Sequence, residues 1–245
     1  MKPMIVKQSP SRHFDERKTG VDMLVFHSTA CAMDKALETY DTCEVSPHYV
    51  IDTNGEIIQC VAEDKRAWHA GKSFWRGIDT DINSRSIGIE LLHADLGQCE
   101  FGQKQVEATI KLSHEIIARH HIKPQNIVGH SDIAPLRKPD PGKCFFWKTL
   151  ADNNIGLWYD INKRVAETNL VTLLSLIGYD TRTDEVIKAS GYAFCRRYLP
   201  QFVATITDMD ELLTAIFPAN ERFTFMQEVV FLETLQAVAF AVDER

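Results

Sequence analysis

The sequence has no hydrophobic run long enough to cross a membrane and no N-terminal segment of the secretory type. Its 245 residues include no run approaching the roughly 18 apolar residues that a transmembrane helix needs. Residues 1–8 contain no apolar core after Lys2 that would mark a secretory signal. We therefore expect no transmembrane segment and, for the chain as given, a cytoplasmic location. A periplasmic location is the alternative if a leader has been removed.

Clusters of basic residues are also missing. The chain carries 27 Lys and Arg against 34 Asp and Glu, which gives a formal net charge of −7 at pH 7. Proteins that bind nucleic acid through its phosphates present a basic patch or stripe, and no short window of this sequence is strongly basic. We therefore expect no nucleic-acid partner.

Cysteine pairs with the spacing of a zinc or redox motif are absent. The six cysteines are scattered without a C-x-x-C pair, which argues against a thiolate zinc site and does not require disulfide bonds. We expect reduced thiols, most of them buried. A hydrophobic content of 44% and a charged content of 25% are those of an ordinary globular protein, long enough for a substantial core and a second small domain.

The segment 127–142 joins a short apolar strand to a stiff loop. Ile127–Val128 favours a buried strand, and His130 stands where that strand would end. Three prolines in the following residues remove backbone donors and favour extended neighbours, so we expect an irregular loop there rather than a helix. Such a loop can hold the side chains of Lys138 and Asp140 in fixed positions.

Histidine nitrogen and carboxylate oxygen are both ordinary zinc ligands, and a catalytic zinc needs three protein ligands with a fourth position open. The apolar run 22–26 favours another central strand, and His27 follows it directly. Neighbouring strands that each end in a histidine can bring the two rings close together, so His27 is the candidate third ligand. The alternative is a histidine whose ring bonds a backbone group at a strand end.

A carboxylate interrupts the apolar run 86–92, which otherwise predicts a buried strand. A buried and unpaired Glu90 would be costly, so we expect a cation or a metal-bound water as its partner. Partial burial would raise the pKa of Glu90 toward that of a general base. A structural salt bridge is the alternative.

Trp68 and His69 lie among small residues in the segment 65–71. An aromatic wall with a polar tip could line a substrate groove there. Equally, Trp68 could be an ordinary core residue.

Turn signals and periodicity predict several further elements. They are an irregular lead-in over 1–20, a helix near 35–40, a hairpin around Asn54-Gly55, and a helix over 103–121.

Strand signals stop after residue 150, and we place a domain boundary near 158–166. The predicted division is a catalytic domain over 1–160 and a helical domain over 161–245. Helices are expected near 167–177, 185–198, 208–217 and 222–241, with capping-box spacing at Thr207 and Asp210 and with Pro218 ending the third. Because the candidate catalytic residues all precede the boundary, we expect a chain ending near residue 160 to fold and keep its chemistry.

Several blocks of sequence, taken together, form a recognisable pattern. They resemble the zinc-dependent N-acetylmuramoyl-L-alanine amidases of the AmpD and AmiD type, in the order and spacing of that family. The blocks are His27-Ser28-Thr29, Arg66-Ala67-Trp68-His69-Ala70-Gly71, Asn83 with Ser86-Ile87-Gly88-Ile89-Glu90, and the segment from Gly129 to Gly142.

The resemblance implies an α/β fold, with a mixed central β-sheet flanked by helices and a small C-terminal helical domain. It implies one zinc ion per chain on His27, His130 and Asp140. Glu90 would be the base, and Lys138 would lie near the scissile carbonyl. Substrate contacts would come from Trp68, His69 and Asn83. The tail, through 173–179 and 193–200, is similar to the three-helix peptidoglycan-binding module of AmiD-type enzymes.

The activity implied by this resemblance is hydrolysis of the amide bond between N-acetylmuramic acid and L-alanine in peptidoglycan or its anhydro fragments. Two alternatives are a peptidoglycan recognition protein without catalysis and a zinc peptidase that cuts within the stem peptide. The complete set of ligands with Glu90 and Lys138 favours the amidase. The sequence gives no indication of an oligomeric state.

Overall fold

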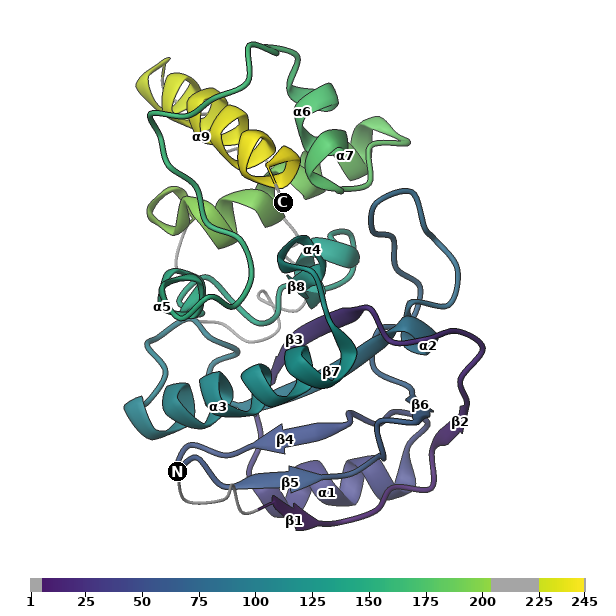
Figure 1. Ribbon diagram of the computed structural model, residues 1–245. Coiled ribbons are helices and arrows are strands. Elements are labelled where there is room, and N and C mark those ends of the chain that lie inside the picture. Colours follow the sequence, from purple (N-terminus) through teal and green to yellow (C-terminus); the bar gives the residue numbers. More distant parts are fainter. Residues whose placement is uncertain (1–5, 204–224, 245) are drawn as a thin grey trace.

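The computed structural model describes residues 6–203 and 225–244, and its centre is a six-stranded sheet with helices on both faces (Figure 1). The strands are β1 (Val6–Gln8), β3 (Met23–Thr29), β4 (Tyr49–Ile51), β5 (Ile57–Gln59), β7 (Ser86–Leu92) and β8 (Ile127–Gly129). Their order is β1-β5-β4-β7-β3-β8, and β4–β5 is antiparallel whereas the other neighbours are parallel. The mixed sheet expected from the sequence is confirmed.

A second, small sheet pairs β2 (Phe14–Glu16) antiparallel with β6 (Lys65–Ala67). The α-helices are α1 (Met33–Thr42), α2 (Ile82–Arg85), α3 (Gln103–His120), α4 (His130–Ile133), α5 (Trp147–Asp152), α6 (Leu170–Ile177), α7 (Asp184–Tyr198) and α9 (Phe225–Asp243). Short 3-10 turns, η1 (Pro124–Asn126) and η2 (Pro200–Phe202), lead into β8 and follow α7. Within 6–203 and 225–244, no helix has the length and apolar character needed to cross a membrane.

Several expected elements are present, and some need correction. The hairpin at Asn54-Gly55 is the β4–β5 pair, and the expected helices near 35–40, 103–121, 167–177, 185–198 and 222–241 match α1, α3, α6, α7 and α9. The lead-in over 1–20 is not irregular throughout, because β1 and β2 pair with the distant strands β5 and β6. The loop after β8 begins with the one-turn helix α4, which ends before the first proline of that loop. The helix expected over 208–217, with Thr207, Asp210 and Pro218, lies outside the described residues.

All six cysteines are free, as expected, but the expectation that most are buried is wrong. Only Cys60 and Cys195 are buried, whereas Cys43 and Cys99 are exposed. Cys43 caps the C-terminal end of α1, and Cys99 lies in the turn before α3. Both are therefore surface positions that the sequence pattern did not distinguish.

The two faces of the central strand β3 belong to different hydrophobic cores. Leu24 and Phe26 pack in the core that includes α3, whereas Met23 and Val25 pack in the core that includes α6 and α7. On this second face, α1 covers β4 and β5. Alternation along the strand places His27 on the same face as Val25. The C-terminal half of β3 on this face therefore lies between α1 and the C-terminal helices.

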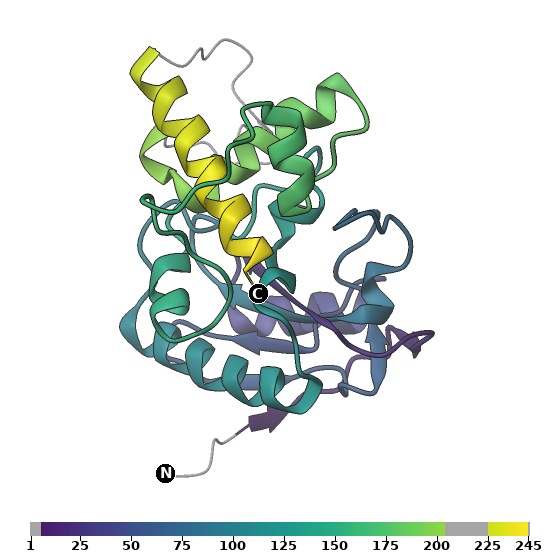
Figure 2. The same ribbon diagram turned by 45° about the horizontal axis from the view of Figure 1, so that its top comes forward.

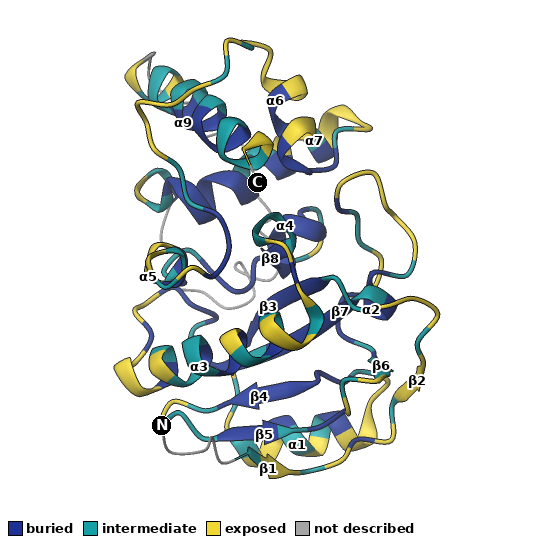
Figure 3. Ribbon diagram, viewed as in Figure 1, coloured by how far each residue is buried: buried dark blue, intermediate teal, exposed yellow. Residues whose placement is uncertain are grey.

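The C-terminal helices share their hydrophobic core with the sheet. Val25 of β3 and Ile133 of α4 belong to the same cluster as Leu173 of α6, Phe194 of α7 and Leu235 of α9. Two views show these helices grouped on the side of the molecule where β8 and α4 lie (Figures 1 and 2). The sides of α7 and α9 that face this core are buried (Figure 3).

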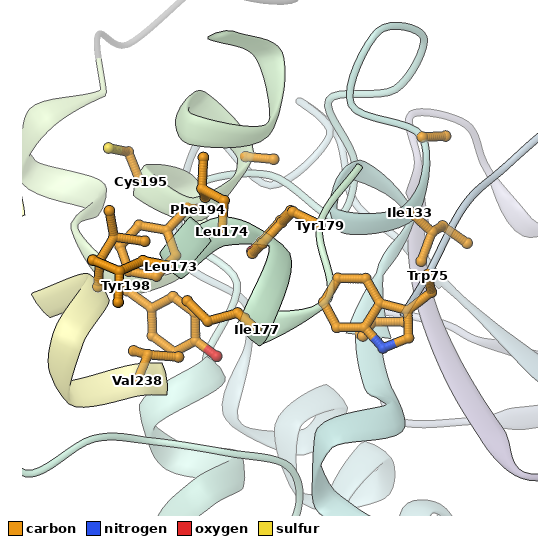
Figure 4. Packing of buried hydrophobic residues seen from close by; sticks show 14 of the residues in the cluster. Trp75, Ile133, Leu173, Leu174, Ile177, Tyr179, Phe194, Cys195, Tyr198 and Val238 are labelled. Carbon is orange, nitrogen blue, oxygen red and sulfur yellow. The ribbon is translucent and has the colours of Figure 1, made fainter. Parts of the chain in front are cut away.

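Within this core, aromatic rings connect the segment before α2 to the C-terminal helices. The Tyr179 ring lies 5.3 Å from the Trp75 ring and 6.2 Å from the Phe194 ring, measured between centroids. Figure 4 shows Tyr179 between Trp75 and Ile133 on one side and the residues of α6 and α7 on the other. The segment 153–169 has no helix or strand, so the predicted boundary falls in a connecting segment. The division into two domains stays a prediction.

Glu63 ties the loop after β5 to β4 and to the end of α3. Its carboxylate accepts hydrogen bonds from the Tyr49 hydroxyl at 2.7 Å, from Arg119 at 2.6 and 3.0 Å, and from His120 Nε2 at 2.6 Å. Burial alone would raise the pKa of Glu63. The bonds from Arg119, Tyr49 and His120 outweigh burial and lower the pKa to about 2 from the usual 4.5.

We expect Glu63→Gln to destabilise the protein by on the order of 2 kcal/mol near neutral pH, because hydrogen bonds to a charged carboxylate are lost. A lowered pKa contributes stability above the unfolded value of 4.5, and this contribution is lost as the pH falls toward about 2. The difference in melting temperature between wild type and variant should therefore shrink over this range. A difference that is constant from pH 7 to pH 2.5 would contradict the role given to the Glu63 charge.

Candidate active site

Strand register brings three of the predicted site residues together. His27 of β3 is the cross-strand partner of Glu90 of β7, so the two side chains leave the same face of the sheet. On the other side of β3, Phe26 pairs with Gly129, and His130 follows Gly129 as the first residue of α4. His27 continues the strand to Thr29 instead of ending it, so the histidine lies within the sheet.

The two histidines and Asp140 form a compact, buried cluster. His27 Nδ1 lies 3.0 Å from His130 Nδ1, and Asp140 Oδ2 lies 3.4 Å and 3.1 Å from these two nitrogens. Four-coordinate zinc with bonds of about 2.0–2.1 Å places its ligand atoms roughly 3.3 Å apart. The spacing of the three atoms therefore fits three corners of a tetrahedral metal site.

The protonation of His130 follows from its second ring nitrogen. His130 Nε2 lies 3.2 Å from the carbonyl oxygen of Ala70. A carbonyl accepts and does not donate, so this nitrogen carries the proton, and Nδ1 is left with a free lone pair. The backbone of Ala70 is fixed in turn, because its N–H donates to the Asn83 side chain at 2.7 Å.

A chain of hydrogen bonds sets the protonation of His27. The Ser86 hydroxyl donates to the carbonyl oxygen of Ile82 at 2.7 Å, so it accepts from His69 Nε2 at 3.2 Å. His69 Nδ1 is then unprotonated and accepts from His27 Nε2 at 2.9 Å. His27 Nδ1 is consequently free to bind a metal. This orientation of a metal-binding histidine through its other nitrogen is usual in metal sites.

Burial keeps His27 and His69 neutral, which leaves His27 able to bind a metal. Burial and the neighbouring His130 lower the pKa of His27 to about 4. Burial and His27 lower the pKa of His69 well below its ordinary value. Asp140 supplies the third ligand atom, a carboxylate oxygen that lies within 3.4 Å of Nδ1 of His27 and Nδ1 of His130. The Nδ1 lone pairs of His27 and His130 and the negative oxygen of Asp140 thus point to one position, where a divalent cation could bind all three.

Glu90 is a second carboxylate at this site, and it has a different character. Within the part of the chain that the structure describes, its side chain has no hydrogen bond or ion pair. Burial and the negative charge of Asp140 raise the pKa of Glu90 well above its ordinary value, while Lys138 acts in the opposite direction. A carboxyl group that is easily protonated next to a metal site suits proton transfer.

The other predicted site residues lie at different distances from the cluster. Lys138 is partly buried and close enough for its charge to act on His27 and Glu90. Asn83 is buried, and its Oδ1 accepts from the backbone N–H groups of His69 and Ala70, at 3.1 and 2.7 Å. These bonds give Asn83, like His69, a supporting role. Whether either also contacts substrate stays a prediction.

Trp68 is partly exposed and directly follows β6 of the small sheet. Its indole N–H donates to the Asp15 carboxylate at 2.8 Å, and its ring lies 5.7 Å from that of His13. It is therefore not a core residue. Its contact with substrate stays a prediction.

Two residues that support the site were not predicted from the sequence. The Ser86 hydroxyl accepts from His69, which in turn accepts from His27. The Asp132 carboxylate accepts from the backbone N–H of Gly129, the residue before His130, at 2.8 Å. Both lie inside the motif blocks, and a polar residue in an otherwise apolar strand or turn was the signal available. Their partners are distant in sequence, so the sequence could not identify what they bind.

A divalent cation held by two imidazoles and a carboxylate, next to a carboxyl group of raised pKa, is suited to activating water. The site is thus of the kind found in metal-dependent hydrolases. A family model described as N-acetylmuramoyl-L-alanine amidase matches residues 17–143, a span that contains all of the candidate ligands and catalytic residues. The chain belongs to this family of amidases.

Relatives of known sequence agree with this membership. The chain is 40% identical over 190 residues to the N-acetylmuramoyl-L-alanine amidase AmiD of Escherichia coli (strain K12), covering 67% of this chain and 68% of AmiD. It is 43% identical over 103 residues to the 1,6-anhydro-N-acetylmuramyl-L-alanine amidase AmpD of Enterobacter cloacae. That match covers 42% of this chain and 54% of AmpD.

Solved structures extend the similarity to the C-terminal helices. A complex of the Escherichia coli amidase AmiD with the substrate anhydro-N-acetylmuramic acid-L-Ala-D-gamma-Glu-L-Lys matches with a TM-score of 0.71 and 30% identity, over 96% of this chain and 98% of AmiD. AmpDh3 from Pseudomonas aeruginosa matches with a TM-score of 0.72 and 27% identity, over 93% of this chain and 94% of AmpDh3. The α/β fold is therefore shared with these proteins.

Gly88 leaves room for the ring that orients His27. A Cβ atom at Gly88 would lie 2.5 Å from Cγ of His69, so Gly88→Ala must displace that ring and break the His69–His27 bond. We expect the dissociation constant for zinc, measured by chelator competition, to rise by about 10- to 100-fold. Gly20→Ala is the matched control, because its Cβ would meet no atom within 4 Å. Unchanged zinc affinity in Gly88→Ala would show that His69 does not support the metal site.

Proposed function

We propose that this amidase binds one zinc ion through His27, His130 and Asp140 and hydrolyses the amide bond between N-acetylmuramic acid and L-alanine in muropeptides. The observation that carries the proposal is the meeting of two imidazole nitrogens and one carboxylate oxygen within 3.4 Å in a buried site. Such a set of lone pairs is stable only around a cation. A recognition protein without catalysis would have no need for it.

In the proposed reaction, each residue around the metal position has a separate role. Zinc, when bound, would lower the pKa of water in the site toward about 7 and polarise the substrate carbonyl. Glu90 takes the proton from the attacking water and returns it to the leaving amine of L-alanine. Lys138 places a positive charge where the carbonyl oxygen becomes negative in the transition state. The donor chain through His69 keeps His27 in one orientation throughout.

A pocket of about 360 Å³ is lined in part by residues 133–137, the segment between His130 and Asp140. Its lining supports an acidic peptide as the substrate. Arg137 lines it and donates to the Ala70 carbonyl oxygen at 3.1 Å, the same atom that His130 Nε2 contacts. Lys72 and Arg182 also line the pocket, but Arg182 is paired there with the carboxylates of Asp79 and Asp180, which leaves Lys72 and Arg137 as the other cations. In the AmiD substrate the γ-linked glutamate leaves a free α-carboxylate close to the scissile bond. We propose that Arg137 and Lys72 attract such carboxylates.

The compartment and the role of the tail stay predictions. The C-terminal helices resemble a peptidoglycan-binding module, and we propose that they bind peptidoglycan in addition to packing on the sheet. The cytoplasmic location expected from the sequence is likewise a prediction, with the periplasm as the alternative.

The proposed reaction can be tested by its products. Purified protein with about one zinc per chain should release an intact peptide that begins with L-alanine from an anhydromuropeptide, as measured by mass spectrometry. Glu90→Gln keeps the size of the side chain and removes the base. It should retain zinc and lose about 10²-fold or more in kcat. Products cut within the stem peptide would indicate a zinc peptidase, and His130→Ala with full zinc occupancy would remove His130 from the ligands.

Lys138→Ala tests the oxyanion role. Because Lys138 would act on charge that develops only in the transition state, the variant should bind zinc and substrate nearly normally while kcat falls by about 10²-fold. Lys138→Arg should rescue only part of the loss, since a planar guanidinium places its charge differently from an ammonium. A rise in KM with kcat unchanged would instead make Lys138 a contact for a substrate carboxylate.

A further inference from the structure

Asp132 lies two residues after His130 and is almost completely buried, with 1% of its side chain exposed. Its Oδ2 atom accepts from the backbone N–H of Gly129 at 2.8 Å and from Arg197 Nη1 at 2.9 Å. Its Oδ1 atom accepts from the hydroxyl of Tyr179 at 2.7 Å. Both oxygens of this carboxylate are therefore held by residues of the C-terminal helical part.

Arg197 is also buried, with 4% of its side chain exposed, and it has two further contacts. Its Nη2 atom donates to the carbonyl oxygen of Ile127 at 3.0 Å, and its guanidinium carbon lies 4.1 Å from the centre of the Trp147 ring. Helix α7 is thus bonded both to β8, which leads into His130, and to α4, which begins with it.

Helix α4 is too short to hold its own shape. It has four residues, His130–Ile133, and a single helical turn gains too few backbone bonds to offset the cost of ordering it. The direction of the His130 ring therefore depends on what anchors the turn. On the side of the metal, the Ser131 N–H donates to the Asp140 carbonyl oxygen at 2.8 Å. On the opposite side the anchor is Asp132.

We propose that Arg197 and Tyr179 are positioning residues for the metal site. They hold Asp132, and through α4 they fix His130 Nδ1 at its distance from His27 and Asp140. The C-terminal helices are thus a structural part of the catalytic unit, whether or not they also bind peptidoglycan. The proposal relies on the proposed function only in taking His130 as a zinc ligand.

The charge of Arg197 is what keeps the buried Asp132 carboxylate in place. A buried carboxylate without a cation is costly, so loss of Arg197 would push the Asp132 side chain toward water. This movement would shift the turn that carries His130. Metal affinity is sensitive to such movements, since loss of a supporting bond typically costs 10- to 100-fold in affinity. On this proposal a chain ending near residue 160 would bind zinc poorly, contrary to the expectation from sequence.

Tyr179→Phe in the full-length chain is the mildest test, because the ring stays in the core and only the bond to Asp132 is lost. We expect about 10-fold weaker zinc binding by chelator competition, and a lower kcat with unchanged KM at saturating zinc. Tyr198→Phe is the matched control. It removes a hydroxyl from the same core, and among the described residues that hydroxyl has no hydrogen bond. Its zinc affinity and kcat should equal those of wild type.

Arg197→Met removes the charge and should weaken zinc binding by about 100-fold, while Arg197→Lys should restore part of the affinity. Melting of the metal-free variants separates this effect from loss of folding. Wild-type zinc affinity in Tyr179→Phe would overturn the proposal, even if the variant melts at a lower temperature, and so would equal losses in Tyr179→Phe and Tyr198→Phe. Failure of the proposed zinc site is distinguished by His130→Ala, which would then bind zinc as wild type does.

Discussion

Two unprotonated imidazole nitrogens and a carboxylate oxygen cannot share a buried volume unless a cation lies among them, and the rest of the active site follows from this constraint. Each ring must present its free nitrogen inward, so each outer nitrogen needs an acceptor. His130 finds one in a backbone carbonyl, and His27 finds one in His69, whose own proton goes to Ser86. Removing any link would allow a ring to turn, and the metal would lose a ligand.

Two features of the sheet make this arrangement possible: the register of its strands and the space that Gly88 leaves on one face. Parallel pairing of β3 with β7 and β8 sets His27 beside Glu90 and next to the start of α4. Gly88, two residues before Glu90 on the same face, leaves the space that the His69 ring occupies. Hydrophobic packing of both faces fixes the strands, so their polar side chains are held without flexible loops.

The C-terminal helices connect to the same site through charge and through packing. A shared hydrophobic core holds them against the face of the sheet where Met23 and Val25 lie. The ion pair between Asp132 of α4 and Arg197 of α7 adds a second connection. A module used only to bind a polymer would need no buried ion pair next to a metal ligand. This pair is the basis of our proposal that the helices contribute to the geometry of the candidate site.

The sequence by itself determined which residues are candidates for the metal site and for catalysis. Strand patterns and proline spacing pointed to His27, His130 and Asp140, and a carboxylate in an apolar strand marked Glu90, because these are local signals that chemistry imposes on neighbouring residues. Tertiary structure alone decided how they are supported. His69 and Asn83 hold the site through buried hydrogen bonds, β1 and β2 form by pairing with distant strands, and Asp132 meets Arg197 65 residues away. Partners so far apart in the chain are chosen by the packing of the whole fold, which no local pattern contains.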